Sequence, residues 1–190
     1  MNGYFSSAGV FLIEAIFGLY IGAIMIRFLL QLVRADFYNP ICQFLVKVTN
    51  PPLKPLRRII PGIGGLDVAS IVLMIALQLI EILLIAFLAG ASPNIVGLLV
   101  ISIGKLIALL LNVYMFSILI QIVLSWVGGG GHNPLVSLLY SLNEPVMRPA
   151  RRILPPISGI DLSPILVFLA IGLLKILLVA PLLDLGRSLG

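Results

Sequence analysis

The sequence predicts an all-α membrane protein with four transmembrane helices in two parallel tandem repeats, and three observations lead to this fold class. First, 61% of the 190 residues are hydrophobic and 10% are charged, whereas soluble domains carry roughly 25% charged residues. Second, four apolar stretches have the length of about 20 residues that crosses a bilayer. Third, the chain repeats itself. A soluble protein is excluded, because so small a core would leave large apolar patches in water.

The expected spans cover residues 8–33, 66–89, 102–127 and 160–183. A short uncharged turn joins the second span to the third, whereas long loops rich in proline and arginine follow the first and third spans. Each loop opens with Asn-Pro and a stretch of helical apolar spacing, which predicts a short interfacial helix. The prolines that follow are expected to prevent a longer helix.

An internal repeat organises the whole chain. An offset of 94 residues places Val33–Asp67 on Val127–Asp161, with 13 identical residues in 35 positions. We therefore divide the chain into a first repeat, residues 1–94, and a second repeat, residues 95–190. Because each repeat holds two spans, both repeats enter the membrane from the same side, unlike the inverted repeats of many carriers.

The charges of the loops predict the orientation in the membrane. The long loops contain clusters of lysine and arginine, whereas the turn between the second and third spans has no charge. By the positive-inside rule, both long loops are cytoplasmic and both termini lie outside. The only histidine is His132 and the only cysteine is Cys42, so we expect no metal, no cofactor and no histidine-based catalysis.

A proline and arginine motif occurs once in each repeat. The pattern N-P, then P-x-x-[KR]-P-x-R-R-[IL]-[IL]-P, then G-[IL]-D spans Asn39–Asp67 and again Asn133–Asp161. In these residues practically the whole chain resembles the YggT family of bacterial membrane proteins, also called YlmG-like in plastids and cyanobacteria. One departure is that Gly128–Gly131 of the second copy replace Arg34–Phe37 of the first.

The resemblance implies a multi-pass protein of the bacterial inner membrane without known enzymatic chemistry. Members of the family are associated with tolerance of osmotic or ionic stress, with cell division and nucleoid distribution, and with assembly of plastid membrane complexes. We therefore expect a non-enzymatic organising or accessory role. The alternative is an ion channel or transporter that uses charges inside the membrane.

Six basic residues of the loops are candidate contacts for anionic lipid headgroups, for membrane protein partners or for a second copy of the chain. They are Lys54, Arg57, Arg58, Arg148, Arg151 and Arg152. Determination of topology alone also explains them, since a few arginines beside a span fix its orientation. So few basic residues, without interleaved aromatic residues, argue against binding of nucleic acid.

Asp67 and Asp161 directly precede the second and fourth spans. An aspartate at that position accepts hydrogen bonds from unpaired amides at the start of a helix, so both are predicted N-caps. An additional ion pair with the adjacent arginines of the same loop is compatible with this assignment.

Charges inside the spans are costly and are therefore candidates for function. Four of them are expected in the outer half of the membrane, with a net charge of zero: Glu14, Glu81, Lys105 and Lys175. We expect a neutral cluster that pairs Glu81 with Lys175 and Glu14 with Lys105 and so joins the helices, with a polar path for ions or protons as the alternative. Arg27 is expected to extend its side chain to the cytoplasmic surface.

Overall fold

The computed structural model describes residues 2–91, 94–127, 133–156 and 161–189. Within these ranges the chain is helical, without strands apart from an isolated bridge between Ile63 and Leu66. The helices are α1 (Asn2–Leu32), α2 (Pro40–Ile59), α3 (Val68–Ala89), α4 (Ile95–Val127), α5 (Pro134–Ile153), α6 (Ser163–Leu174), the π-helical turn η1 (Lys175–Val179) and α7 (Ala180–Ser188). The predicted all-α class is confirmed.

Four of these helices are long and apolar enough to cross a membrane: α1, α3, α4 and the continuous rod formed by α6, η1 and α7. Only 17% of the most apolar window of α1 is buried, and 22% of that of α4. Most apolar side chains of these helices are therefore at least partly exposed. Such large apolar surfaces are rare on soluble proteins and are suited to contact with lipid hydrocarbon. The prediction of four membrane-spanning helices is therefore confirmed.

The helices extend beyond the predicted spans. α1 begins at Asn2 rather than at residue 8, α4 begins at Ile95 rather than at residue 102, and the last rod continues to Ser188. Hydropathy identifies only the apolar stretch that crosses the hydrocarbon core. The helix itself can continue beyond that stretch for as long as its backbone hydrogen bonds form. The predicted start of the fourth span, Ile160, lies outside the described residues.

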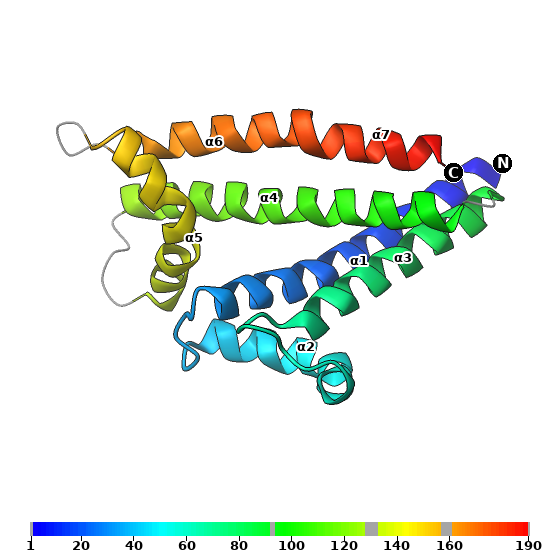
Figure 1. Cartoon of the computed structure of the whole chain (residues 1–190), viewed down its shortest axis with the longest axis horizontal. Coiled ribbons are helices and arrows are strands. Elements are labelled where there is room, and N and C mark those ends of the chain that lie inside the picture. The colour runs from blue at the N-terminus through cyan, green and yellow to red at the C-terminus, as the bar shows by residue number, and fades with distance from the viewer. Residues whose placement is uncertain (1, 92–93, 128–132, 157–160, 190) are drawn as a thin grey trace.

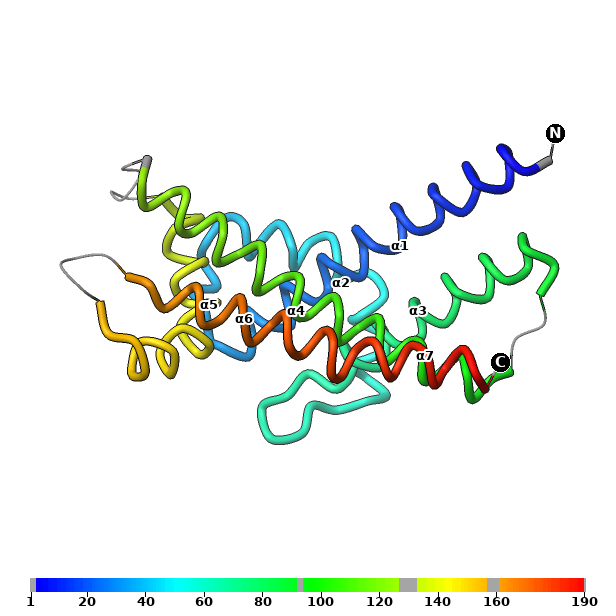
Figure 2. Tube along the Cα trace, turned by 90° about the horizontal axis from the view of Figure 1, so that it is seen from above, coloured from blue at the N-terminus to red at the C-terminus, as the bar shows by residue number. Residues whose placement is uncertain are grey.

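The spans form two antiparallel pairs, α1 with α3 and α4 with the α6–η1–α7 rod, and α3 packs against α4 between them (Figure 1). Seen from above, the N-terminal half of α1 diverges from α4 and α7 (Figure 2). We call the end that holds both termini the terminal face. The other end, where α2 and α5 lie across the spans, is the loop face.

Two clusters of buried side chains form the core. The first surrounds Ile24 of α1, and the second surrounds Ile118 of α4. Helices α4 and α5 contribute to both clusters, and α4 is the central span because it packs against α1, α3 and the α6–η1–α7 rod. At the loop face the two repeats are also joined by a hydrogen bond of 2.8 Å from Nδ2 of Asn39 to the carbonyl oxygen of Pro134.

The expectation that prolines prevent a long interfacial helix is wrong. Helix α2 continues through Pro51, Pro52 and Pro55, and α5 continues through Pro145 and Pro149. Each proline removes a backbone donor and bends its helix, and both helices change direction partway along their length (Figure 1). The helices persist because one face of each is buried against the spans, so tertiary packing outweighs the local cost.

Candidate functional site

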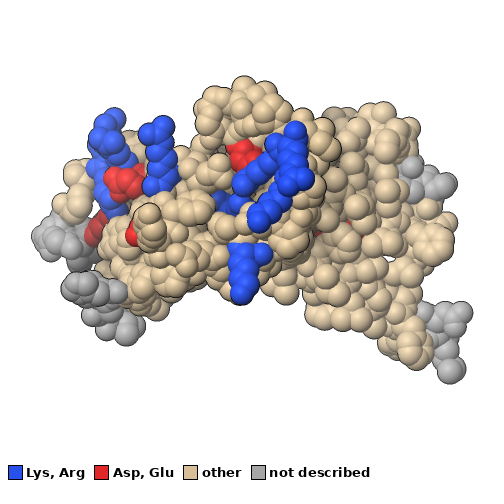
Figure 3. All heavy atoms as spheres, turned by 90° about the horizontal axis from the view of Figure 1, so that it is seen from below, with Lys and Arg blue, Asp and Glu red and all other residues tan. Residues whose placement is uncertain are grey.

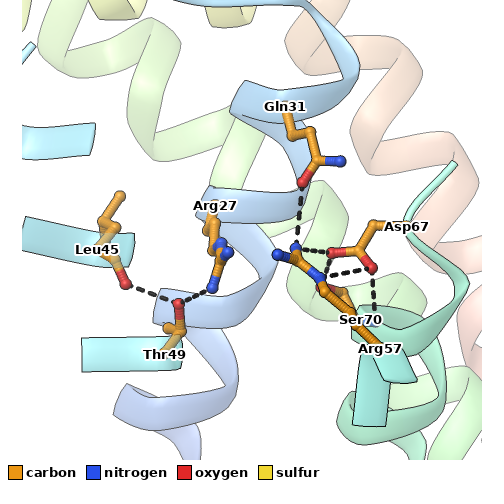
Figure 4. A network of polar contacts seen from close by, with 7 residues as sticks. All are labelled: Arg27, Gln31, Leu45, Thr49, Arg57, Asp67 and Ser70. Atoms are coloured by element: carbon orange, nitrogen blue, oxygen red, sulfur yellow. Dashed lines mark hydrogen bonds and ion pairs between the residues drawn. The ribbon is translucent and has the colours of Figure 1, made fainter. Parts of the chain in front are cut away.

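An arginine and an aspartate bind α2, the amphipathic helix of the first repeat, to α3, the second span (Figure 4). Helix α5 is the amphipathic helix of the second repeat. Arg57, near the end of α2, binds both carboxylate oxygens of Asp67, with 3.3 Å between Nε and Oδ1. Asp67 is the N-cap of α3, and its carboxylate also accepts hydrogen bonds from the amide and hydroxyl of Ser70. Arg57 donates a further hydrogen bond of 3.4 Å from Nη2 to Oε1 of Gln31 on α1. Three elements therefore meet at one ion pair.

The second repeat forms the same ion pair in a more open setting. Nε of Arg151 donates to Oδ2 of Asp161 at 2.9 Å, and Nη1 donates to Oε2 of Glu144 at 3.1 Å. The side chain of Asp161 is 34% exposed, whereas that of Asp67 is 5% exposed. Asp161 is thus in contact with solvent or headgroups and Asp67 is buried, whereas the two arginines are exposed to a similar extent.

Asp161 does not occupy the predicted N-cap position, because Leu162 is the residue that precedes α6. Its carboxylate still accepts the amide of Ser163 at 2.9 Å, together with the hydroxyl of the same residue. In the first repeat Asp67 accepts the amide three residues ahead, but the corresponding residue here is Pro164, which has no amide hydrogen. The aspartate therefore bonds one residue earlier.

The two aspartates are held in their ionised form. Burial raises the pKa of the Asp67 carboxyl, but hydrogen bonds from Arg57 and Ser70 and the guanidinium charge outweigh it and leave the pKa below its ordinary value. The pKa of Asp161 is lowered in the same way. Burial raises this pKa, but hydrogen bonds from Ser163 and Arg151 outweigh the effect of burial. Both ion pairs are therefore present at neutral pH.

A second polar contact anchors each amphipathic helix to the first span of its repeat. Nη1 of Arg27 donates to Oγ1 of Thr49 at 2.6 Å, and at the equivalent place Nδ2 of Asn143 donates to Oε1 of Gln121 at 2.7 Å. Arg27 is 6% exposed. The expectation that it extends to the surface is wrong, because α2 covers it and supplies its hydrogen-bond partner.

Four of the six basic candidates remain exposed on the loop face: Lys54, Arg58, Arg148 and Arg152. None of them forms a side-chain hydrogen bond or ion pair with another described residue. Figure 3 shows the basic side chains gathered in two groups, one over each amphipathic helix. The first arginine of each adjacent pair, Arg57 or Arg151, thus has an internal partner, while the second points away from the protein.

The four intramembrane charges form different pairs from those expected. Glu81 binds Lys105, with 3.0 Å between Oε1 and Nζ, and accepts a hydrogen bond of 2.9 Å from Nε2 of Gln78. This occurs because α3 packs directly against α4, so Lys105 rather than Lys175 lies opposite Glu81. A shallow open pocket of about 230 Å³ adjoins this ion pair and is lined by Gly18, Gln78, Asn112 and Leu183 among others.

Lys175 and Glu14 have no ionic partner among the described residues. Nζ of Lys175 donates to Oδ1 of Asn112 at 2.6 Å, at the start of the π-helical turn η1. Pro181 lies one residue into α7 and lacks an amide hydrogen, which accounts for the widened turn before it. Glu14 is exposed on α1, on the same helical face as Gly18. The predicted pairs of Glu81 with Lys175 and of Glu14 with Lys105 are wrong.

Some site residues were absent from the sequence prediction. The contacts of Thr49 and Asn143 escaped it because neither residue is identical in the two copies of the motif. A comparison of the two copies would have revealed these residues, because both copies have a polar side chain at this position on the otherwise apolar face of the helix. Among the described residues, no three His, Cys, Asp or Glu side chains gather into a possible metal site. His132 and Gly128–Gly131 lie outside those residues.

Comparisons with known proteins match nearly the whole chain. The model of a family described as CCB3/YggT matches residues 6–88 and 100–182. An uncharacterized protein of Pseudomonas aeruginosa is 45% identical over 176 residues, which are 92% of this chain and 89% of that protein. The protein named YggT of Escherichia coli K12 is 37% identical over 161 residues, 84% of this chain and 82% of its own length.

A protein of Vibrio alginolyticus, described by its position in the proC 3′ region, is 37% identical over 163 residues, which cover 85% of this chain and 88% of that protein. No solved structure matches the chain. The two matched ranges place one copy of the family pattern on α1–α3 and another on α4–α7.

Proposed function

The chain belongs to the CCB3/YggT family of multi-pass membrane proteins, and we propose that it has an organising or accessory role without catalysis. In this role the exposed basic residues of α2 and α5 contact anionic headgroups and neighbouring membrane proteins. In accordance with the positive-inside rule, the proposal puts these helices at the cytoplasmic surface of the inner membrane, with both termini outside. Support for osmotic and ionic tolerance, or for assembly of membrane complexes and cell division, is the physiological outcome we propose.

One observation carries this proposal. In each pair of adjacent arginines, one side chain fixes the helix to the spans and the other stays exposed. An amphipathic helix that only marked topology would not need an ion pair, a helix cap and a buried polar contact to hold it. Here these contacts hold both helices against the spans, and each helix presents its remaining basic residues outward, as a docking surface requires.

Complementation of a bacterial strain that lacks this protein tests the role, with growth after a hyperosmotic shift as the measurement. The docking variant combines four substitutions: Lys54→Gln, Arg58→Gln, Arg148→Gln and Arg152→Gln. We expect it to reach the membrane but fail to restore growth. As a matched control, Arg187→Gln removes an exposed charge of the same type at the terminal face and should restore growth. Full complementation by the docking variant would contradict the proposal.

A second function, ion conduction, is favoured by one observation, the open pocket beside the ion pair of Glu81 and Lys105. Gln78 and Asn112 add polar groups to its wall, and intramembrane ionisable residues commonly mark ion or proton paths. We therefore propose a flux measurement in liposomes that contain only the purified protein, under potassium, sodium and proton gradients.

The flux measurement separates the two functions. Flux that Glu81→Gln and Lys105→Gln abolish in a folded protein would establish conduction. If folded protein gives no flux above that of empty liposomes, the ion pair serves to join α3 to α4. The same two substitutions should then lower the melting temperature, because each leaves one charge of the ion pair without its partner.

A further inference from the structure

An amphipathic groove opens beside the ion pair of the second repeat, between α4, α5 and α6. Its volume is about 450 Å³, within the range of small-molecule sites. Most of its lining is apolar and includes Ile122, Met147 and Phe168. Arg151 and Asp161 lie on its wall at the loop face. The groove therefore combines an apolar interior with a charged rim.

At the equivalent place in the first repeat, the pocket beside Gln31 has a volume of only about 10 Å³. Gln31 there accepts a hydrogen bond from Nη2 of Arg57. The equivalent residue in the second repeat is the shorter Ser125, which lines the groove. Nη2 of Arg151 accordingly donates to no residue in the described part of the chain. The donor that Gln31 satisfies in the first repeat thus has no acceptor among the described residues of the second.

The position of the groove matches the level of lipid headgroups. Trp126 and Tyr140 both line it, and Trp126 is 84% exposed. Exposed tryptophan and tyrosine beside a span are typical of the interface between membrane and water. An amphiphile in the groove would therefore hold its polar end beside Arg151 and its chain against the spans.

The charges of the rim select among phospholipids. Arg151 supplies hydrogen-bond donors for a phosphate, and Asp161 supplies a partly exposed carboxylate on the same rim. A second exposed carboxylate, that of Glu144, lies just outside the lining and binds Arg151 at 3.1 Å. An anionic headgroup has no positively charged group that could bind these carboxylates, so it would be repelled by them. A primary ammonium can donate hydrogen bonds to them, and a trimethylated ammonium cannot.

We propose that this groove holds one phospholipid with a primary ammonium headgroup, of the phosphatidylethanolamine type. Its phosphate accepts from Nη2 of Arg151, its ammonium binds Glu144 and Asp161, and one acyl chain lies between α4 and α6. The site belongs to the second repeat alone, and it is separate from the exposed basic residues of the proposed docking surface.

Delipidated protein in detergent provides the test, with phosphatidylethanolamine, phosphatidylglycerol and phosphatidylcholine added in turn. The measurements are the melting temperature against lipid concentration and the number of lipids retained in native mass spectrometry. We expect phosphatidylethanolamine to raise the melting temperature at the lowest concentration, with one molecule retained. Equal effects of all three lipids, or a preference for phosphatidylglycerol, would overturn the proposal.

Two variants locate the site. Ser125→Gln introduces the residue of the first repeat, which fills the groove and satisfies Nη2 of Arg151. We expect it to weaken phosphatidylethanolamine binding about tenfold, the effect of losing one charged hydrogen bond. Ser188→Gln makes the same change at the terminal face and should leave binding unchanged. Unchanged binding in folded Ser125→Gln protein would contradict the assignment.

Glu144→Gln provides an independent measurement, because this exposed side chain can change without disturbing the core. We expect the preference for phosphatidylethanolamine over phosphatidylcholine to shrink, because the ammonium loses one of its two carboxylates. If the preference is unchanged, the ammonium is not recognised here and the proposal fails.

Discussion

At the scale of single residues, the two repeats carry the same ion pair with different access to solvent. Asp67 is 5% exposed and Asp161 is 34% exposed, although each binds the equivalent arginine. Burial strengthens an ion pair whose remaining hydrogen bonds are satisfied and makes loss of one partner more costly. The first pair should therefore matter more for stability than the second.

Asp67→Ala is expected to lower the free energy of unfolding by about 1 to 3 kcal/mol, because it removes a helix cap and leaves Arg57 without its carboxylate. Asp161→Ala should cost less than about 1 kcal/mol, since solvent screens the exposed pair. Both values are measured by adding a denaturing detergent to the protein in micelles of a mild detergent and following its unfolding. Equal losses would show that burial does not distinguish the two sites.

The lowered pKa of Asp67 predicts how stability depends on pH. Its folded pKa lies below the ordinary value of 3.8, so the carboxylate stabilises the protein fully above about pH 4. This contribution is lost as the pH falls through the folded pKa. The melting temperatures of wild type and Asp67→Asn should therefore differ most near neutral pH and converge in acid. A difference that grows below pH 4 would reverse the sign and contradict the assignment.

At the scale of elements, hydropathy located the four spans but local rules failed for α2 and α5. A span is specified by apolar length alone, which the sequence displays directly. The prolines of α2 favour an end to the helix, yet burial of Leu45, Thr49 and Leu53 on one face holds it together. Such burial depends on the neighbouring helices, so the local sequence of α2 does not predict that the helix continues through its prolines.

Close contact between α4 and α7 depends on a glycine. A Cβ atom at Gly186 would lie 2.5 Å from Cγ1 of Ile101 and 3.1 Å from the carbonyl oxygen of Gly97. Because backbone atoms cannot move aside, Gly186→Ala should destabilise the protein by about 1 to 3 kcal/mol. Gly172→Ala, where nothing lies within 4 Å, should be neutral or slightly stabilising. Detergent unfolding of the two variants compares them, and similar losses would place the close contact elsewhere.

At the scale of the whole molecule, the repeat symmetry does not determine which charges inside the spans become partners. Glu81 and Lys175 are equivalent in sequence, yet Glu81 binds Lys105, because α3 packs against α4. Equivalent positions in a parallel repeat need not be neighbours, since the order of helices in the bundle decides which faces meet. The same limit hid the groove of the second repeat, which depends on small differences such as Ser125 for Gln31.

The parallel repeat makes a prediction about topology that concerns the entire chain. Since two spans separate α2 from α5, both amphipathic helices must lie on one side of the membrane. We propose that this side is cytoplasmic, so Arg58→Cys and Arg152→Cys should both resist a membrane-impermeant maleimide in intact cells. Tyr4→Cys, at an exposed position near the N-terminus, should react. Each variant is made with Cys42→Ala, which removes the only native thiol.

The pattern of labelling separates three arrangements. Protection of both loop cysteines with reaction at position 4 supports parallel repeats with cytoplasmic loops. Reaction of both loop cysteines with protection at position 4 would reverse the orientation while keeping the fold, and the basic residues would then have to meet partners outside the cell. Opposite results for positions 58 and 152 would contradict the four-span arrangement itself, because an even number of crossings cannot place them on different sides.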